Sequence, residues 1–243
     1  THRGNVSLRR MCALSAEIKL GFIGLGLSSA VAFGQMNGSY TIDAASAASS
    51  TNFQSWTTFA TAWNAAAITG PVTVTVKSNI NIGAAFVTLN ANAGSSATNT
   101  LTIDGQNTTM TYTSTYAALR LNGADYVTVK NLNIENNSTT PGGVWITNQA
   151  DYNTISGVNI YLSANTVATT GAYYIAMSTS VSSPTSTASV ATGTTGQPGS
   201  FNSIENCNMY TAAGNVGPYY GVTMTGNSSN YTTVAQNNTM KGC

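Results

Sequence analysis

Short runs of alternating apolar and polar residues recur along most of the chain. Leu, Val, Ile or Met occupies every second position in four such runs, at 119–121, 144–146, 175–177 and 222–224. Alternation with a period of two is typical of a strand that buries one face. The pattern therefore predicts an all-β protein built from many short strands.

A sequence motif repeats with a fixed spacing. The segment 122–134, NGADYVTVKNLNI, recurs 26 residues later as 148–160, NQADYNTISGVNI, and weaker copies follow at 204–209 and 231–240. A unit of two or three short strands cannot bury its apolar side alone, but stacked units share a continuous core. We therefore expect successive copies to stack in register about 4.8 Å apart, the spacing of paired strands.

Aligned copies predict which residues share a position in the stack. The small polar residues of the motif fall between apolar columns, where Asn and Gly are interchangeable if the backbone takes a left-handed bend. The expected bends are at Asn131, Gly157 and Asn206. The expected inward columns are Val129, Ile155, Ile204 and Val234; then Leu132, Val158 and Cys207; then Ile134, Ile160 and Met209.

Rungs of this kind, such as LNGADYVTVKNLNI at 121–134, resemble those of the right-handed parallel β-helix proteins of the pectin lyase-like superfamily. The resemblance covers about residues 70–243, and the segments 38–42, 56–63 and 70–76 are similar to the entry segment of secreted bacterial members. It implies a right-handed parallel β-helix, a solenoid. An antiparallel sandwich would also alternate, but it does not explain the 26-residue offset.

The chain divides into segments with different expected roles. A short capping helix is expected over 56–67, because Trp56, Phe59, Ala60 and Trp63 share one helical face and Ser55 suits an N-cap. We expect an entry segment and cap at 36–71 and the parallel β-helix at 72–243, interrupted by an exposed Ser/Thr-rich loop at 178–200. No polar cap is visible before Cys243, so a C-terminally truncated fragment is expected.

The first 35 residues have the features of a secretory signal peptide. Basic residues precede an apolar stretch that ends in the small residues Ala32-Phe33-Gly34. The alternative is a membrane anchor, but the apolar stretch is about 14 residues, against the roughly 20 that a spanning helix needs. We expect a secreted or cell-surface protein with no membrane span in its mature chain.

Charge is scarce: Asp, Glu, Lys and Arg make up 6% of the chain, against about 25% in an ordinary soluble domain. Without residues 1–35, four basic and six acidic side chains give a formal charge of −2, which excludes a nucleic-acid-binding surface. The sole histidine, His2, lies in the signal peptide, so His-based catalysis is excluded from the mature chain. Of the two remaining cysteines, Cys207 is expected to be buried, and a Cys207–Cys243 bridge is an alternative.

The outward positions of the alternating runs are candidates for substrate binding. Arg120, Trp145, Ala176 and Thr223 alternate with apolar residues, and the resemblance implies that this sheet faces polysaccharide. An exposed Trp offers a flat surface to a sugar ring, and Arg offers a planar fork to a carboxylate. Tyr173 and Tyr174 lie near the same edge. The alternative is that Trp145 packs beneath the 178–200 loop and Arg120 only solvates the face.

Asp125 and Asp151 occupy equivalent positions in adjacent repeats. Either each carboxylate bonds amides of its own turn, or a Ca²⁺ ion lies between the two. The acidic clusters of pectate lyases and polygalacturonases cannot be placed on this sequence, so no catalytic residue is assigned.

We expect a structural or adhesive module that contacts polysaccharide through one sheet face, with no cofactor beyond this Ca²⁺. The alternatives are a lyase or hydrolase of uronic-acid polysaccharides and a filament subunit that self-associates end to end.

Overall fold

A computed structural model of the chain describes residues 34–115, 117–138, 142–162, 172–178, 199–215, 217–218, 220–225 and 235–243. The expected signal peptide, except Gly34 and Gln35, lies outside the described residues, as do residues 179–198 of the expected loop. Ser178, expected to open that loop, instead ends a strand and is buried.

The described chain is mostly β, and its strands form three parallel sheets. Sheet A has eight strands, in the spatial order β18-β15-β12-β9-β6-β3-β1-β2. Their bounds are Thr239–Lys241 (β18), Ser203–Glu205 (β15), Thr154–Ser156 (β12), Val127–Lys130 (β9), Leu101–Asp104 (β6), Ala67–Val76 (β3), Gln35–Ile42 (β1) and Asn52–Phe53 (β2).

Sheets B and C have five strands each, in the orders β16-β13-β10-β7-β4 and β17-β14-β11-β8-β5. The bounds in sheet B are Asn208–Thr211 (β16), Asn159–Leu162 (β13), Asn133–Asn136 (β10), Thr109–Tyr112 (β7) and Ile80–Asn81 (β4). Those in sheet C are Tyr220–Thr225 (β17), Tyr173–Ser178 (β14), Gly142–Thr147 (β11), Ala117–Asn122 (β8) and Val87–Asn90 (β5).

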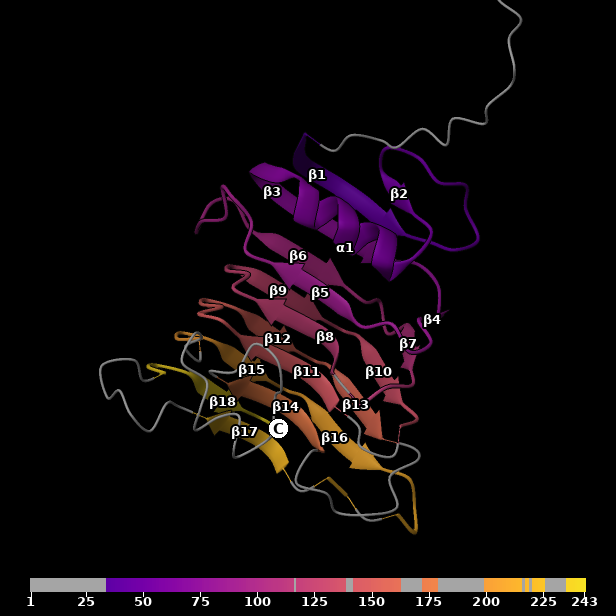
Figure 1. The fold of residues 1–243 in the computed structure, drawn as a ribbon, viewed down its shortest axis with the longest axis vertical. Helices are drawn as coiled ribbons and strands as arrows, with labels where there is room; N and C mark the ends of the chain where they lie inside the picture. Colours follow the sequence, from indigo (N-terminus) through magenta and orange to yellow (C-terminus); the bar gives the residue numbers. More distant parts are fainter. Residues whose placement is uncertain are drawn as a thin grey trace, which may run out of the picture. The chain divides into compact units, whose positions relative to one another are not determined.

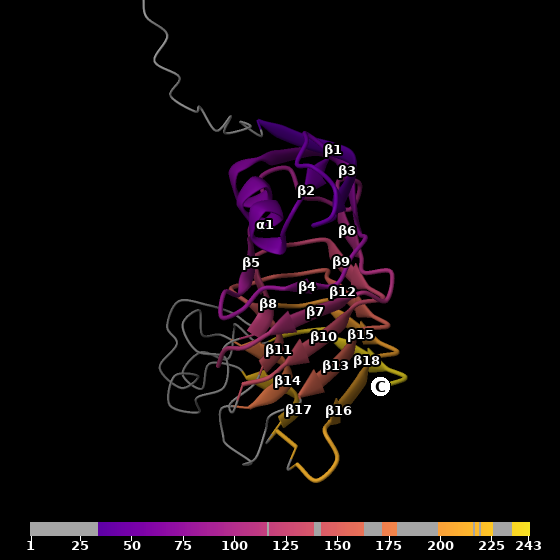
Figure 2. The ribbon, with the colours of Figure 1, turned by 90° about the vertical axis from the view of Figure 1, so that its right-hand side faces the viewer.

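The chain visits the three sheets in a fixed order. From β3 to β17 each circuit adds one strand to sheet A, then one to sheet B, then one to sheet C. Strands of successive circuits therefore lie side by side, as Figure 1 shows for β8, β11 and β14 and Figure 2 shows for β7, β10 and β13. All of their pairings are parallel, which agrees with the expected stacking of repeats.

The register of the repeats is confirmed for the two full copies and the third. Val129 pairs with Ile155 and Ile155 with Ile204, and all three are buried in one continuous core. The fourth copy was misaligned: Met240, not Val234, pairs with Ile204, and Val234 lies outside the described residues. The true offset between these two copies is 36 residues, and the fourth copy lacks the Asp-Tyr pair that aligns the first two. The sequence alone therefore did not determine which residue pairs with Ile204.

The predicted bends are also confirmed. Asn131, Gly157 and Asn206 have φ values of 52°, 60° and 52°, and Gly242 continues the series at 66°. The first three residues turn the chain from a strand of sheet A toward one of sheet B, and Gly and Asn are the residues that adopt this left-handed conformation most readily. Leu132, Val158 and Cys207 follow directly and are buried.

Helix α1, Trp56–Ala65, begins as predicted at an N-cap formed by Ser55, whose side chain accepts a hydrogen bond from the backbone N–H of Thr58. It ends two residues earlier than expected, because Ala66 is already extended. Asn64 binds the edge strand β5 as a neighbouring strand would: its Nδ2 donates to Thr88 O at 2.9 Å, and its Oδ1 accepts from Asn90 N at 2.8 Å. The helix thus covers an edge of sheet C (Figure 1).

A column of asparagines, of which Asn153 and Asn202 are buried, joins successive circuits of sheet A. Asn153 Oδ1 accepts from Val127 N, Asn202 Oδ1 from Asn153 N and Asn238 Oδ1 from Asn202 N, at 2.8 to 2.9 Å. These three residues form the inner Asn ladder. Each side chain binds a backbone amide one circuit away, so the ladder fixes the register in which circuits stack.

Within the described residues, no helix is both long and apolar enough to cross a membrane.

The left-handed bend gives a direct test of the stacked repeats. We expect Gly157→Val to lower the free energy of unfolding by about 2 kcal/mol, because a β-branched residue is strained at positive φ. Gly157→Asn is expected to cost much less, since Asn occupies the equivalent bends. Denaturant unfolding of both variants measures the difference, and equal losses would contradict the shared left-handed geometry.

Candidate functional site

The outward residues of the alternating runs form one column across sheet C. Thr88, Arg120, Trp145, Ala176 and Thr223 are consecutive register partners in β5, β8, β11, β14 and β17. The structure therefore brings Arg120, Trp145 and Thr223 into the single column that the sequence predicted. We call these five residues the outer column of sheet C.

Trp145 is not the exposed platform that the sequence suggested. Its side chain is 1% exposed and packs in a small apolar cluster with Ala117, Tyr173 and Ala176, separate from the main core. The indole Nε1 donates to Ser178 Oγ at 2.8 Å. No ring face of Trp145 is open to a sugar, which agrees with the alternative that Trp145 is packed rather than exposed; residues 179–198 of the loop expected to cover it lie outside the described residues.

The two predicted tyrosines belong to different parts of the structure. Tyr173 is fully buried beside Trp145, and its ring lies against Gly142, where a Cβ atom would overlap it. Tyr174 points the other way, into the main core. Thr223 is also buried. Of the five predicted binding residues, only Arg120 retains appreciable exposure.

The guanidinium of Arg120 lies between two aromatic rings. Its Cζ is 5.5 Å from the ring centroid of Phe86 and 5.2 Å from that of Trp145, within the range of cation–π attraction. Burial lowers the pKa of Arg120, and the nearby Tyr173 opposes that change. Phe86 was missed because it precedes the alternating run of β5, and it is 39% exposed.

Asp125 and Asp151 lie in adjacent circuits, as predicted, but they do not bond amides of their own turns. Asp125 Oδ1 accepts from Asp151 N at 2.8 Å, and Asp151 Oδ1 accepts from Ser200 N at 2.6 Å. Each carboxylate therefore holds the backbone of the following circuit. Among the described residues, no three His, Cys, Asp or Glu side chains gather as a metal site would require.

Burial raises the pKa of Asp125, and the neighbouring Asp151 charge raises it further, while the hydrogen bond from Asp151 N acts in the opposite direction. Asp104 behaves differently. Burial raises its pKa, but hydrogen bonds from Gln106, Asn131 and Lys130 outweigh this and leave the pKa lowered. Lys130 Nζ also lies 3.3 Å from Asp104 Oδ2.

Beside the two aspartates, three aromatic rings stack on one another. Tyr126, Tyr152 and Phe201 have centroid separations of 4.9 and 4.8 Å and interplanar angles of 2° and 4°. All three residues have positive φ, between 57° and 58°. The Asp-Tyr pair that recurs in the repeat was the available signal for this stack of rings. The stack was not predicted, because aromatic residues rarely adopt a left-handed backbone conformation.

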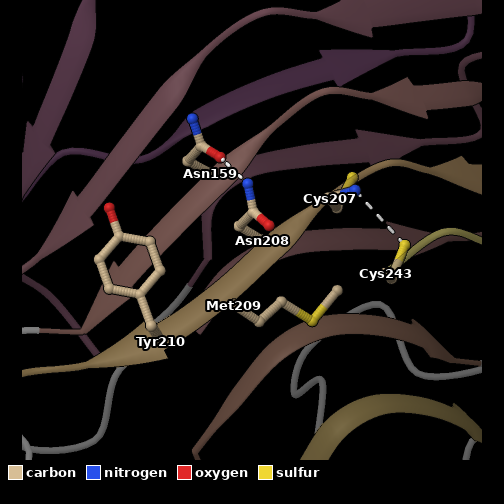
Figure 3. A pocket seen from close by; sticks show the side chains of 6 residues that line it. All are labelled: Asn159, Cys207, Asn208, Met209, Tyr210 and Cys243. Atoms are coloured by element: carbon tan, nitrogen blue, oxygen red, sulfur yellow. Dashed lines mark hydrogen bonds between the residues drawn. The ribbon is translucent and has the colours of Figure 1, made fainter.

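A cavity of about 590 Å³ lies along the edge strand β16. It is lined by Asn159, Cys207, Asn208, Met209, Tyr210 and Cys243 (Figure 3). Both thiols are free. Cys207 is buried as expected, and burial raises its pKa to about 11, whereas Cys243 is exposed. Cys243 Sγ accepts from Cys207 N at 3.5 Å, so the two cysteines are neighbours in the stack.

The chain matches no protein-family model, no curated protein and no solved structure.

The Asp125 pair predicts a specific pH dependence. A carboxyl group with a raised folded-state pKa contributes stability below the unfolded pKa near 3.8 and loses it as pH rises through the folded value. Asp125→Asn keeps the oxygen that accepts from Asp151 N but carries no charge. We therefore expect the variant to lose less stability than the wild type as pH rises from about 4 to 7.

Thermal unfolding across this pH range provides the measurement. Asp104→Asn is the matched control: the pKa of Asp104 is lowered, so its contribution is present above 3.8 and is lost as pH falls. Identical pH profiles for Asp125→Asn and the wild type would contradict the raised pKa of Asp125.

Proposed function

We propose that this chain is a secreted or cell-surface module with the right-handed parallel β-helix fold of the pectin lyase-like superfamily. We propose further that it serves a structural or adhesive role and contacts polysaccharide through the outer face of sheet C. The fixed order in which the chain visits three parallel sheets supports the β-helix. The basic, then apolar, then small-residue pattern of residues 1–35 supports export.

The observation that carries the carbohydrate proposal is the Arg120–Phe86 pair. The ring of Phe86 lies against the guanidinium at the outer face of sheet C, and Phe86 as a residue remains 39% exposed. An exposed aromatic ring packs against the C–H groups of a sugar, and a guanidinium binds a carboxylate with two parallel hydrogen bonds. Together they suit a uronic-acid residue better than a neutral sugar.

The residues around Arg120 order its guanidinium before any ligand binds. The ring of Trp145 lies below the guanidinium and is itself fixed by the hydrogen bond to Ser178. A side chain ordered before binding loses less conformational entropy when the ligand arrives. This supports Trp145 as a positioning residue for Arg120, in place of the direct sugar contact that the sequence suggested.

Binding of polygalacturonate, measured by calorimetry on the full chain, tests the proposal. We expect Arg120→Gln and Phe86→Ala each to weaken binding about tenfold, the effect of one charge-assisted hydrogen bond or one aromatic contact. The affinity of Arg120→Lys should fall between those of Arg120→Gln and the wild type, because lysine keeps the positive charge but cannot form two parallel hydrogen bonds with a carboxylate. Lys77→Gln, in the link between β3 and β4, is the matched charge control and should bind normally.

Two results would contradict the proposal. Equal binding by all variants would show that sheet C is not the contact surface. Release of unsaturated or shortened uronide products would instead favour the lyase or hydrolase alternative.

A further inference from the structure

The geometry points to a redox modification site, in which Cys207 and Cys243 form a disulfide that links two successive circuits of the stack. Both thiols are free in the structure, so the bond is a product of oxidation after the chain has folded. The inference rests on the proposed export of the chain, because disulfides form and persist in oxidising compartments.

The two cysteines occupy the same position in consecutive circuits. Each directly follows a residue with left-handed backbone, Asn206 with φ 52° and Gly242 with φ 66°. The strands that precede these bends, β15 and β18, are paired in parallel. Cys243 is therefore stacked on Cys207 by the same register that stacks the other residues of these two strands.

The surroundings of the two sulfur atoms also repeat from one circuit to the next. Cys207 Sγ donates to Ile155 O at 3.5 Å, and Cys243 Sγ donates to Ile204 O at 3.7 Å. Ile155 and Ile204 are themselves register partners. The two thiols are thus displaced from each other by one circuit, with the same orientation in each.

The displacement of one circuit suits a disulfide. Paired strands lie about 4.8 Å apart, and the Cα atoms joined by a disulfide are usually about 4.4 to 6.8 Å apart. Cys243 Sγ already points toward its partner, because it accepts from Cys207 N at 3.5 Å (Figure 3). Rotation of the two side chains about their Cα–Cβ bonds can therefore join the sulfur atoms with little movement of the backbone.

The reaction requires an oxidant, which is a small disulfide RSSR such as glutathione disulfide. The thiolate of Cys243 attacks one sulfur atom of RSSR, which forms a mixed disulfide with Cys243 and releases RS⁻. Cys207 then loses its proton, and its sulfur attacks that of Cys243 and displaces the second RS⁻. The protons of the two cysteine thiols pass to the two RS⁻ ions. Two thiols are thereby oxidised to one disulfide, and one RSSR is reduced to two RSH.

The order of these steps follows from the burial of Cys207. Burial raises the pKa of its thiol to about 11, so little of it is present as the thiolate that attacks a disulfide. The residue is also only 1% exposed and belongs to the main core, out of reach of RSSR. Cys243 is therefore the attacking thiol, and Cys207 resolves the mixed disulfide.

The bond closes a covalent loop over residues 208–242, which contain β16, β17 and β18. Such a link restricts the unfolded chain more than the folded one, and it stabilises the folded state if it fits the native geometry. Oxidation is therefore expected to hold these three strands more firmly on the stack.

Oxidation of the full chain carrying Cys12→Ser tests the site, because only Cys207 and Cys243 then remain. The folded protein is incubated with glutathione disulfide, digested without reduction and analysed by mass spectrometry. We expect a linked pair of peptides that contains both cysteines, from a chain that stays monomeric. The temperature of thermal unfolding should be about 5 to 10 °C higher than that of the same sample after reduction.

Two single variants are the matched controls. Cys207→Ser should stop at the mixed disulfide of Cys243 with glutathione, and Cys243→Ser should leave Cys207 unmodified. Neither variant should show the rise in unfolding temperature.

Three results with the chain that keeps both cysteines would overturn the proposal: two free thiols after the incubation, a mixed disulfide that persists, or a disulfide between two copies. These readouts involve no polysaccharide and no export. Failure of the disulfide and failure of the proposed function are therefore distinguishable.

Discussion

Parallel, in-register stacking is the constraint on which the rest of this structure depends. Each side chain lies directly over its equivalent in the next circuit, about 4.8 Å away. A residue is therefore tolerated only if its side chain interacts favourably with the side chain at the equivalent position one circuit away, whether that residue is of the same type or of another. Aliphatic side chains do so by packing, and aromatic rings do so by stacking, as in Tyr126, Tyr152 and Phe201.

The same constraint explains why charge is scarce and amides are abundant. Like charges repel in such a stack, whereas an asparagine side chain both donates and accepts. Where charges do share a column they alternate in sign: Asp104 pairs in register with Lys130, and Glu205 with Lys241. Asp125 and Asp151 are the exception, and both carboxylates bind a backbone amide of the next circuit.

Sequence reasoning was strongest where the stack imposes periodicity. The 26-residue repeat predicted the register of Val129 with Ile155 and the left-handed bends, because these features depend on local pattern. It failed where one position depends on distant neighbours. The sequence left the exposure of Trp145 open between two alternatives, because packing across several strands decides it. The contact of Arg120 with Phe86 joins β8 to the residue before β5, and these two segments are not repeats of one motif. The inner Asn ladder was visible as an asparagine before Thr154-Ile155, Ser203-Ile204 and Thr239-Met240, but its hydrogen bonds could be assigned only from the structure.

The stacking itself can be measured through contacts between methyl groups. In a chain with labelled isoleucine and valine methyls, in-register stacking predicts nuclear Overhauser effects from Val129 to Ile155 and from Ile155 to Ile204. These residues are far apart in sequence, but they are paired in register and buried together. Absence of these contacts, with Ile155 in contact with residues of antiparallel neighbours instead, would contradict parallel, in-register stacking.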